Sequence, residues 1–422
     1  MINIEQFKIR QHYVSLLQKN DKNLFYNHAN GKIAVADSAE TIEEQFFLPA
    51  DDIRIDLNEV CYEQLYLVVS ESCNFRCKYC RQERTSGIIN MSKEDIRYAI
   101  DTFYLLSKKP RSVVFFGGEP LLNIEGIKYA IRYIKSFDKN IRFSMVINGA
   151  LCTEKIAAFF AQNNVEIIVS LDGPELLHNQ ARMTADGKET YQKALRGYRF
   201  LKKAGCRTGI TTVIGPHNEH HFVEMINWAI ELHPDSLGFC LPHGDENNYA
   251  MKLSSFDVVH QKMIEAFDVL REHDIHLVQV EQKLAAFLSG RAIAYECKAC
   301  GKRIVACSGK RFGICEGLIT NHESFFHDVS ELPNYIREYK KTSPFYIPEC
   351  QACVAYRICG GGCVYDKLTR FGCADIPDEC RCGLNRLIAE RALEYTADHI
   401  SSKKRVLTQE DRTLLRQTLF TD

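Results

Sequence analysis

The sequence predicts an α/β protein with a parallel sheet, followed by a region rich in cysteine. From about residue 65, short β-branched runs alternate with amphipathic helical stretches, and this alternation repeats six times. Strands that alternate with helices form parallel sheets with right-handed crossovers. Beyond residue 290 the pattern changes, because eleven of the eighteen cysteines lie between residues 291 and 383.

The strand candidates are short and almost continuously apolar, as in a sheet that is covered on both faces. Between them, helical stretches place apolar residues at i, i+3 and i+4, with Ser92 and Thr153 as N-cap candidates. Six such units form a full barrel, a partial barrel or an open doubly wound sheet. In each case functional residues gather at the carboxyl ends of the strands. The predicted strands are residues 65–69, 112–118, 142–149, 165–173, 208–215 and 236–244.

Three polar or glycine-rich motifs follow directly after predicted strands. GGEP (117–120) follows the second strand, Asn148-Gly149 ends the third, and Asp172-Gly173 ends the fourth. Because the carboxyl ends of parallel strands meet at one rim, we expect these motifs to lie close together.

The chain divides into four predicted parts. Residues 254–290 predict further helices, and residues 384–399 predict a final helix before a charged tail. The cysteine-rich part has too little apolar periodicity for a core of its own, so we expect it to need metal. The parts are an N-terminal extension (1–61), the strand–helix region (62–290), the cysteine-rich region (291–383) and a C-terminal helix with its tail (384–422).

Composition limits the partners and the use of the cysteines. The formal net charge is −1, so no global field favours nucleic acid or an anionic membrane, and we expect neither as a partner. The first residues lack the apolar segment of a signal peptide, and no stretch is long enough to span a bilayer, so a cytoplasmic location is expected. Disulfides are disfavoured there, which makes metal or redox roles the better explanation of spaced cysteines. Isolated cysteines in apolar contexts are expected to be small buried side chains: Cys61, Cys152, Cys206 and Cys240.

The first cysteine group follows the first predicted strand. Cys73, Cys77 and Cys80 form a CxxxCxxC pattern, which can hold three irons of a cubane and leave the fourth open to another ligand. A zinc site would need a fourth ligand nearby. No cysteine or histidine lies between Cys80 and Cys152, so a three-ligand site is the better interpretation.

Further cysteines predict metal sites in the C-terminal half. Cys350, Cys353, Cys359 and Cys363 form one closely spaced group, whose glycines permit close approach of the backbone to a cluster. Zinc remains an alternative to iron here, because tetrahedral thiolate sites use similar spacings. The other candidate ligands are Cys297, Cys300, Cys307, Cys315, Cys373, Cys380 and Cys382.

These motifs together resemble the radical S-adenosylmethionine superfamily. The resemblance rests on CxxxCxxC with Tyr79 before its last cysteine, on Phe116 with the GGEP that follows it, and on Asn148-Gly149. Ser170-Leu171-Asp172-Gly173-Pro174, followed by Arg182, continues the match in order, and CxxCxxxxxCxxxC at 350–363 is similar to the SPASM extension. The match covers roughly residues 62–390, and the combination is more specific than any single motif.

The resemblance implies a partial (β/α)6 TIM-like barrel with a C-terminal SPASM-type iron–sulfur domain. It implies three [4Fe–4S] clusters, of which the one at Cys73, Cys77 and Cys80 binds S-adenosylmethionine and the other two are auxiliary. Cleavage of S-adenosylmethionine would give a 5′-deoxyadenosyl radical in an enclosed barrel mouth. The residues implied to contact S-adenosylmethionine or to lie near it are Tyr79, Gly117, Gly118, Glu119, Asn148, Ser170, Asp172 and Arg182.

The same resemblance suggests how the remaining cysteines divide. One auxiliary cluster would take Cys297, Cys315 and Cys363, with either Cys300 or Cys307 as the fourth ligand. The other would take Cys350, Cys353 and Cys359, with either Cys380 or Cys382. The family pattern has a glycine five residues before its cysteine, whereas Gly309 lies six before Cys315, so the division stays open at these positions.

Other polar residues have a functional and a plain interpretation. Glu316 follows Cys315, where sulfatase-maturing relatives carry an acidic base, and it is the catalytic candidate; an ordinary loop carboxylate is the alternative. His217, His220 and His221 could bind a metal, but their place at a helix start favours solvated or capping side chains.

The N-terminal extension contains a predicted hairpin with Ala29-Asn30-Gly31 in its turn. Its edge could receive an extended peptide by strand addition, as leader-binding modules do. The alternative is a strand pair that only packs on the barrel.

The predicted function is that of a radical enzyme which modifies a ribosomally made peptide, for example by a thioether or another cross-link. Its expected partners are a peptide or protein substrate, with or without cysteine, and a reduced flavodoxin- or ferredoxin-type electron donor. The alternatives are a sulfatase-maturing enzyme that forms formylglycine and, from another class, a non-catalytic iron–sulfur or zinc scaffold.

Overall fold

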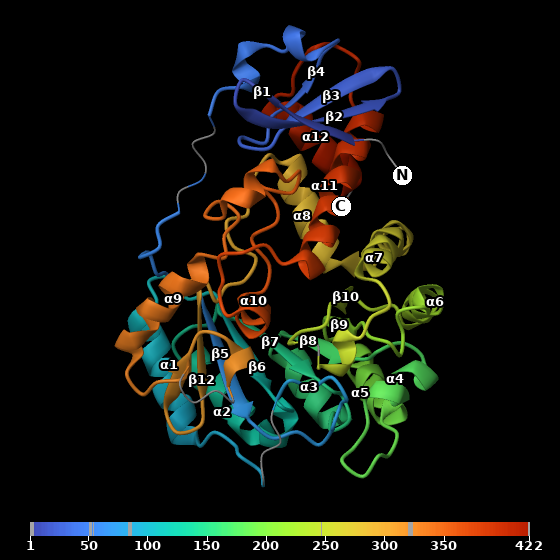
Figure 1. Cartoon of the computed structure of the whole chain (residues 1–422). Helices are drawn as coiled ribbons and strands as arrows, with labels where there is room; N and C mark the ends of the chain where they lie inside the picture. The colour runs from blue at the N-terminus through green and yellow to red at the C-terminus, as the bar shows by residue number, and fades with distance from the viewer. Residues whose placement is uncertain are drawn as a thin grey trace.

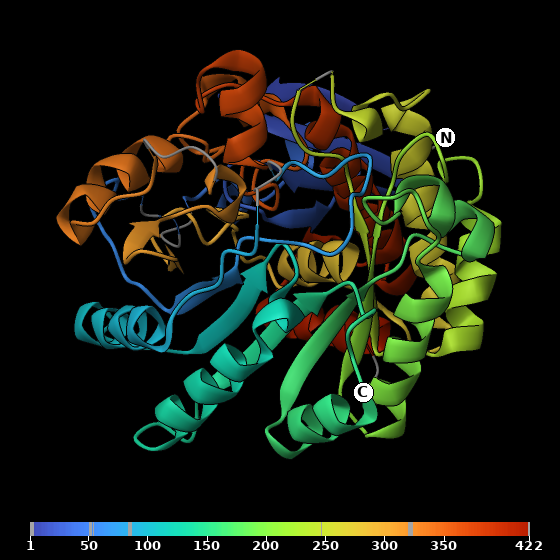
Figure 2. The same ribbon diagram turned by 90° about the horizontal axis from the view of Figure 1, so that it is seen from below.

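This computed structural model describes residues 4–49, 53, 55–82, 87–245, 247–319 and 324–420. Within these residues, the largest element is a nine-stranded sheet. Its central strands, β5 to β10, run parallel and are neighbours in chain order. The sheet curves without closing, which confirms the predicted partial (β/α)6 barrel (Figure 2). These strands are β5 (Gln64–Ser70), β6 (Ser112–Gly117), β7 (Arg142–Ile147), β8 (Val165–Ser170), β9 (Thr208–Val213) and β10 (Ser236–Cys240).

Helices connect these strands and cover the outer side of the curved sheet (Figure 2). Ser92 and Thr153 are N-caps as predicted, since each hydroxyl accepts a hydrogen bond from a backbone N–H three residues on. The apolar stripe of each helix is buried, which is why the periodicity located them. They are α1 (Lys93–Leu106), α2 (Ile124–Lys135), α3 (Glu154–Gln162), α4 (Glu175–Ala181), α5 (Tyr191–Lys203) and α6 (Phe222–Leu232).

The cysteine-rich region adds strands to the barrel sheet. β12 (Arg303–Cys307) pairs parallel with β5, and β13 (Arg311–Gly313) pairs antiparallel with β12. At the opposite edge, the short β11 (His276–Leu277) pairs with β10. The candidate metal ligands on either side of β12 are therefore fixed to the barrel through backbone hydrogen bonds. The remaining helices of this part are α9 (Leu332–Lys340) and α10 (Val364–Phe371).

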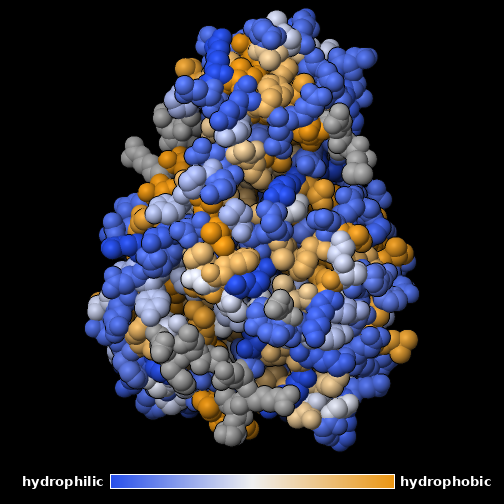
Figure 3. All heavy atoms as spheres, in the orientation of Figure 1, coloured by the Kyte–Doolittle hydropathy of each residue, from blue (hydrophilic) through white to orange (hydrophobic). Residues whose placement is uncertain are grey.

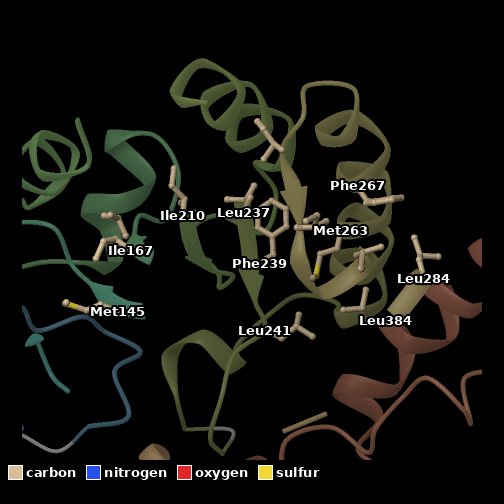
Figure 4. Close-up of a cluster of buried hydrophobic side chains, with 14 of the residues drawn as sticks. Met145, Ile167, Ile210, Leu237, Phe239, Leu241, Met263, Phe267, Leu284 and Leu384 are labelled. Atoms are coloured by element: carbon tan, nitrogen blue, oxygen red, sulfur yellow. The ribbon is translucent and has the colours of Figure 1, made fainter. Parts of the chain in front are cut away.

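One hydrophobic core runs from the barrel into the C-terminal helices. Phe239 of β10 lies in a buried cluster with Met263 of α7 (Phe256–Arg271), Leu284 of α8 (Val278–Leu288) and Leu384 of α11 (Glu379–His399) (Figure 4). This shared core fixes the cysteine-rich region relative to the barrel mouth.

A second sheet contains the N-terminal strands. It is antiparallel, in the order β1-β2-β3-β4-β14, and lies beside α11 and α12 (Gln409–Leu419) (Figure 1). The predicted hairpin is present, because β3 pairs with β4 and Gly31 takes a positive φ of 73° in the connection. The strands are β1 (Ile4–Ile9), β2 (His12–Lys19), β3 (Lys22–Asn27), β4 (Ile33–Val35) and β14 (Arg405–Val406).

The C-terminal segment differs from the expected charged tail. Residues 405–419 form β14, which pairs with β4, and the helix α12. Thr408 and Asp411 form a capping box at the start of α12, and Arg405 pairs with Asp411. These charged residues, which suggested a solvated tail, are therefore the groups that cap and anchor the last helix.

The face seen in Figure 3 is mostly hydrophilic, with apolar side chains in small groups. None of the helices in the described part of the chain has the length and the apolarity needed to cross a membrane.

The buried cluster around Phe239 predicts a large effect of truncation. We expect Phe239→Ala to lower the free energy of unfolding by about 3–5 kcal/mol, because it removes a ring that is 1% exposed and leaves a cavity. Leu105→Ala is the control, since Leu105 is 85% exposed and should change stability by less than about 0.5 kcal/mol. Equilibrium urea unfolding under anaerobic conditions measures both, and equal midpoints would contradict the prediction.

Candidate active site

The three cysteines of the CxxxCxxC motif lie in the loop that follows β5, at the carboxyl end of the sheet. They line one cavity together with residues that follow the neighbouring strands. The predicted contact residues in the wall of this cavity are Tyr79, Gly117, Gly118, Asn148, Ser170 and Arg182. The structure thus brings together at one rim the motifs that the sequence separates by more than a hundred positions.

Backbone hydrogen bonds hold this cysteine loop in place. The N–H of Arg76 donates to the carbonyl of Met183 at 2.6 Å, and that of Lys78 donates to Ala181 at 2.9 Å. Burial raises the pKa of the Cys73 thiol to about 11 and that of Cys77 to about 12. Burial thus disfavours free thiolates here, and an iron cluster held by these cysteines would supply the charge that stabilises them.

Gly117 and Gly118 are needed where β6 ends beside the cysteine loop. A Cβ on Gly117 would lie 2.1 Å from the Ser70 carbonyl oxygen, and one on Gly118 would lie 2.5 Å from that of Ser72. The motif glycines therefore allow the close approach of two backbone segments, in addition to lining the cavity.

Glu119 and Asp172 lie behind the cavity wall, and both are completely buried. The Glu119 carboxylate accepts hydrogen bonds from the backbone N–H groups of Asn148 and Leu121, at 2.7 and 3.0 Å. Burial raises its pKa to about 7. Glu119 thus ties the end of β6 to the end of β7, and Asn148 extends from there to donate to Asn74 in the cysteine loop at 2.7 Å.

Asp172 is the centre of a buried polar network. Its Oδ2 accepts the hydroxyl of Tyr79 and lies 2.9 Å from Nε of Arg182, and its Oδ1 accepts the N–H of Val213 at 3.0 Å. Although burial opposes ionisation, the Arg182 guanidinium and His217 hold the pKa of Asp172 well below its usual range. The network joins the cysteine loop to the ends of β8 and β9.

The predicted solvated or capping role of His217 is wrong. Its side chain is completely buried, stacks on Tyr79 with ring centroids 6.1 Å apart, and lies 3.5 Å from Asp172. His220 and His221 are exposed, as expected. The difference arises because the loop after β9 folds back over the rim, which periodicity alone does not reveal.

His243 is a cavity residue that the sequence analysis did not single out. It follows β10 and lines the same cavity, and its Nδ1 lies 3.0 and 3.1 Å from the two carboxylate oxygens of Asp366. Burial and the Arg381 guanidinium lower the pKa of His243. Nη2 of Arg381 lies 3.1 Å from the same Nδ1, so Asp366 and Arg381 together hold this edge of the ring. The position of His243 at the carboxyl end of the sixth strand was the available signal.

One group of cysteines lies between β12 and α10. Burial raises the pKa of the Cys300 thiol, and the neighbouring thiols of Cys297 and Cys315 raise it further. Cys315 also neighbours Cys363. By contrast, Cys307 packs in a small apolar cluster with Val68, Val305, Ile319 and Phe325. We therefore propose Cys300, rather than Cys307, as the fourth member of this group.

A second group lies where α11 begins. Burial raises the pKa of Cys350 to about 11 and that of Cys382 to about 12, and the thiols of Cys353 and Cys359 contribute to both shifts. Cys380 lies two positions before Cys382 on α11, so the two side chains point in different directions. We propose Cys382 as the fourth member here, and the role of Cys373 stays open.

Glu316 is held between two arginines. Its carboxylate oxygens lie 3.1 Å from Arg303 and 3.5 Å from Arg81, and these cations lower its pKa despite its burial. A carboxylate in two ion pairs is a weak base. The contacts of Glu316 therefore suit an electrostatic role as well as the predicted catalytic role. The catalytic role stays a prediction.

The comparisons with known proteins agree with this geometry. The sequence model of the Radical SAM superfamily matches residues 67–229, which run from β5 into α6. The chain contains a radical SAM domain. The family resemblance seen in the motifs is therefore confirmed, and with it the expectation of S-adenosylmethionine and a [4Fe–4S] cluster.

Two curated relatives extend beyond this domain. The radical SAM cyclopropyl synthase TigE of Paramaledivibacter caminithermalis is 25% identical over 358 residues, which cover 78% of this chain and 74% of TigE. The cysteine-type anaerobic sulfatase-maturating enzyme of Clostridium novyi is 22% identical and covers 72% of this chain, with 87% of its own length matched.

Two solved structures share the fold. Native anSMEcpe with bound AdoMet and Cp18Cys peptide has a TM-score of 0.68 and 22% identity, over 81% of this chain and all of the other. Streptococcus suis SuiB bound to the precursor peptide SuiA has a TM-score of 0.55 and 15% identity, over 76% of each chain. The radical SAM domain of this chain therefore has the same architecture as enzymes of this kind.

The buried network predicts a large penalty for removing one charge. We expect Asp172→Asn to lower the free energy of unfolding by about 3–5 kcal/mol, because Arg182 is left buried without its counter-charge. Tyr79→Phe removes one hydrogen bond to the carboxylate and should cost about 1.5–3 kcal/mol. Asp186→Asn, in the exposed pair with Lys188, is the matched control and should leave the urea midpoint unchanged.

The two groups of neighbouring cysteines predict which cysteines hold iron. After anaerobic reconstitution, Cys300→Ala and Cys382→Ala should each lose about 4 irons per chain, the content of one cubane. Cys307→Ala and Cys380→Ala are the matched controls and should keep the iron of the unmodified chain. Analysis of iron and acid-labile sulfide measures all four variants. Loss of iron in Cys307→Ala instead of Cys300→Ala, or in Cys380→Ala instead of Cys382→Ala, would reverse the assignment of the fourth ligand in that group.

Proposed function

We propose that this radical SAM enzyme modifies a ribosomally made peptide, forming a thioether or another cross-link. The carrying observation is the cavity, whose wall contains the three cysteines of the loop together with Arg81 and His243. Arg81 pairs with Glu316, which follows the auxiliary Cys315, and His243 contacts Asp366, which lies three residues after Cys363. A substrate in this cavity would lie between the radical site and an auxiliary cluster. SuiB bound to a precursor peptide and anSMEcpe bound to a peptide have the same fold and support a peptide substrate.

The residues of the cavity have separate proposed roles. Cys73, Cys77 and Cys80 would hold the [4Fe–4S] cluster, and Gly117, Gly118, Asn148, Ser170 and Arg182 would bind S-adenosylmethionine. When bound, the cluster and S-adenosylmethionine supply a 5′-deoxyadenosyl radical that abstracts a hydrogen atom from the substrate. Asp172 and His217 would position Tyr79 and Arg182, and His243 would contact the substrate from the cavity wall.

The two C-terminal thiol groups would hold two auxiliary [4Fe–4S] clusters, one at Cys297, Cys300, Cys315 and Cys363 and the other at Cys350, Cys353, Cys359 and Cys382. Buried or half-buried cysteines without disulfide partners suit such clusters, because thiolate is the ligand that iron–sulfur clusters use. An auxiliary cluster would take the electron from the substrate radical or hold a substrate thiolate. The electron that starts the reaction would come from a reduced flavodoxin- or ferredoxin-type donor.

The edge of the predicted hairpin is not available for a substrate leader, because β3 also pairs with β2 and β4 also pairs with β14. We propose the edge of the whole N-terminal sheet as the place for the leader instead. β1 is the edge strand, and in the described residues its outer side pairs with no other strand. An extended peptide can add to such an edge through main-chain hydrogen bonds.

The runner-up is a sulfatase-maturing enzyme, which the similarity to the Clostridium novyi enzyme supports. That reaction would use Glu316 as a base. The two arginine partners of Glu316 make it a weak base, so the geometry favours peptide cross-linking over formylglycine formation.

The first test is the release of 5′-deoxyadenosine. We expect the reduced, reconstituted chain to convert S-adenosylmethionine to 5′-deoxyadenosine and methionine, and the Cys73→Ala/Cys77→Ala/Cys80→Ala variant to form neither above background. Liquid chromatography with mass spectrometry measures both products. If the intact chain forms no 5′-deoxyadenosine, the non-catalytic scaffold becomes the better reading.

Deuterated peptides then separate the two enzymatic functions. Peptides encoded beside the gene and a sulfatase active-site peptide should be compared, each deuterated at its candidate carbons. Transfer of deuterium from the former to 5′-deoxyadenosine, with loss of one deuterium and one hydrogen from the peptide, supports cross-linking. Formylglycine in the sulfatase peptide supports the runner-up.

A further inference from the structure

Three charged side chains form a continuous bridge between the cavity and the first auxiliary thiol group. This bridge, Arg81–Glu316–Arg303, has Glu316 at its centre, 3.5 Å from Arg81 and 3.1 Å from Arg303. The side chains are 21%, 16% and 6% exposed, so solvent screens these ion pairs only weakly.

One end of the bridge contacts an auxiliary thiol, and the other end lines the cavity. Arg303 Nη2 donates to the Cys297 thiol sulfur at 3.3 Å, and Glu316 follows Cys315 directly. Arg81 follows Cys80 directly and lines the cavity. The bridge therefore connects the cavity to the auxiliary thiols through two ion pairs.

The surroundings of the bridge fix its geometry. The Arg303 guanidinium lies 4.5 Å from the ring centroid of Tyr66, and its Nε donates to the Ile314 carbonyl at 3.3 Å. Arg81 lies 5.1 Å from the ring centroid of Tyr365. A Cβ on Gly317 would lie 3.0 Å from Tyr365 and 3.4 Å from Arg81, so glycine leaves room for this stacking. A surface ion pair would have none of these constraints.

We propose that Arg303 and Glu316 set the reduction potential of the cluster held by Cys297, Cys300, Cys315 and Cys363, and that Arg81 extends this field to the cavity. One-electron reduction adds one negative charge to a cluster. A cationic N–H donor at a ligand sulfur stabilises the reduced state and raises the potential, whereas a nearby carboxylate lowers it. The inference rests on the proposed auxiliary clusters, and it makes Glu316 a positioning and charge-bearing residue instead of a base.

The test uses the full chain with Cys73→Ala, Cys77→Ala and Cys80→Ala, which leaves only the auxiliary sites. Redox titrations followed by electron paramagnetic resonance compare this background with added Arg303→Gln, Glu316→Gln or Arg81→Gln. At a fixed solution potential, we expect Arg303→Gln to lower the reduced-to-oxidised ratio of the cluster that includes Cys297 about tenfold. For a one-electron couple, this change corresponds to a reduction potential lower by about 59 mV. Glu316→Gln should shift the ratio the opposite way, and Arg81→Gln should act like Arg303→Gln but less.

Two controls separate this effect from a general disturbance. Arg311→Gln removes a similarly buried arginine that pairs with Glu71, and it should leave both potentials unchanged. The second cluster, at Cys350, Cys353, Cys359 and Cys382, should keep its potential in every variant. Arg303→Lys keeps the positive charge, so its reduced-to-oxidised ratio should lie close to that of the background and well above that of Arg303→Gln. A merely structural role of Arg303 would not predict this recovery.

The outcomes distinguish this inference from the proposed function. A background variant without about 8 irons per chain would overturn the auxiliary clusters and the inference together. With the iron present, unchanged potentials in both Arg303→Gln and Glu316→Gln, or shifts of the same sign, would overturn the inference alone.

Discussion

The buried carboxylate of Asp172 is the interaction on which the geometry of the site depends. It binds Tyr79 from the cysteine loop, Arg182 from the end of α4 and the backbone of Val213 at the end of β9. A charge with no exposure to solvent is stable only when it is paired and hydrogen-bonded, so these partners are held in place together. Because Tyr79 lies between Cys77 and Cys80, the position of the thiols follows from the position of Asp172.

The same principle shapes the opposite wall of the cavity. Asp366 of α10 is completely buried and is neutralised by Arg381 at 2.6 Å, while it orients the imidazole of His243. Glu316 is neutralised by Arg81 and Arg303 in a comparable way. In both cases a carboxylate of the cysteine-rich region fixes a side chain that lines the barrel cavity. The proposed substrate chamber is therefore built by two parts of the chain, joined through buried ion pairs and a shared apolar core.

The sequence predicted the barrel elements well, because their cause is local. Apolar strands and amphipathic helices with caps such as Ser92 and Thr153 carry their own signals. Residues 405–419 were misjudged because the charges of Arg405 and Asp411 look solvated until the capping box and the partner strand β4 are known. His217 was misjudged for a related reason, since only the fold of the loop after β9 buries it against Tyr79.

The fold class, the motif at Cys73, Cys77 and Cys80, and its placement on one rim with Asn148 and Asp172 could all be predicted from the order of the residues. These follow from spacing along the chain and from the rule that parallel strands end at the same edge. Which distant groups meet became visible only in the folded chain: Cys300 instead of Cys307 lies beside Cys297, Asp366 pairs with His243, and two arginines pair with Glu316. Such contacts depend on the packing of separate elements, and no local pattern of residues encodes which buried charge will find which partner.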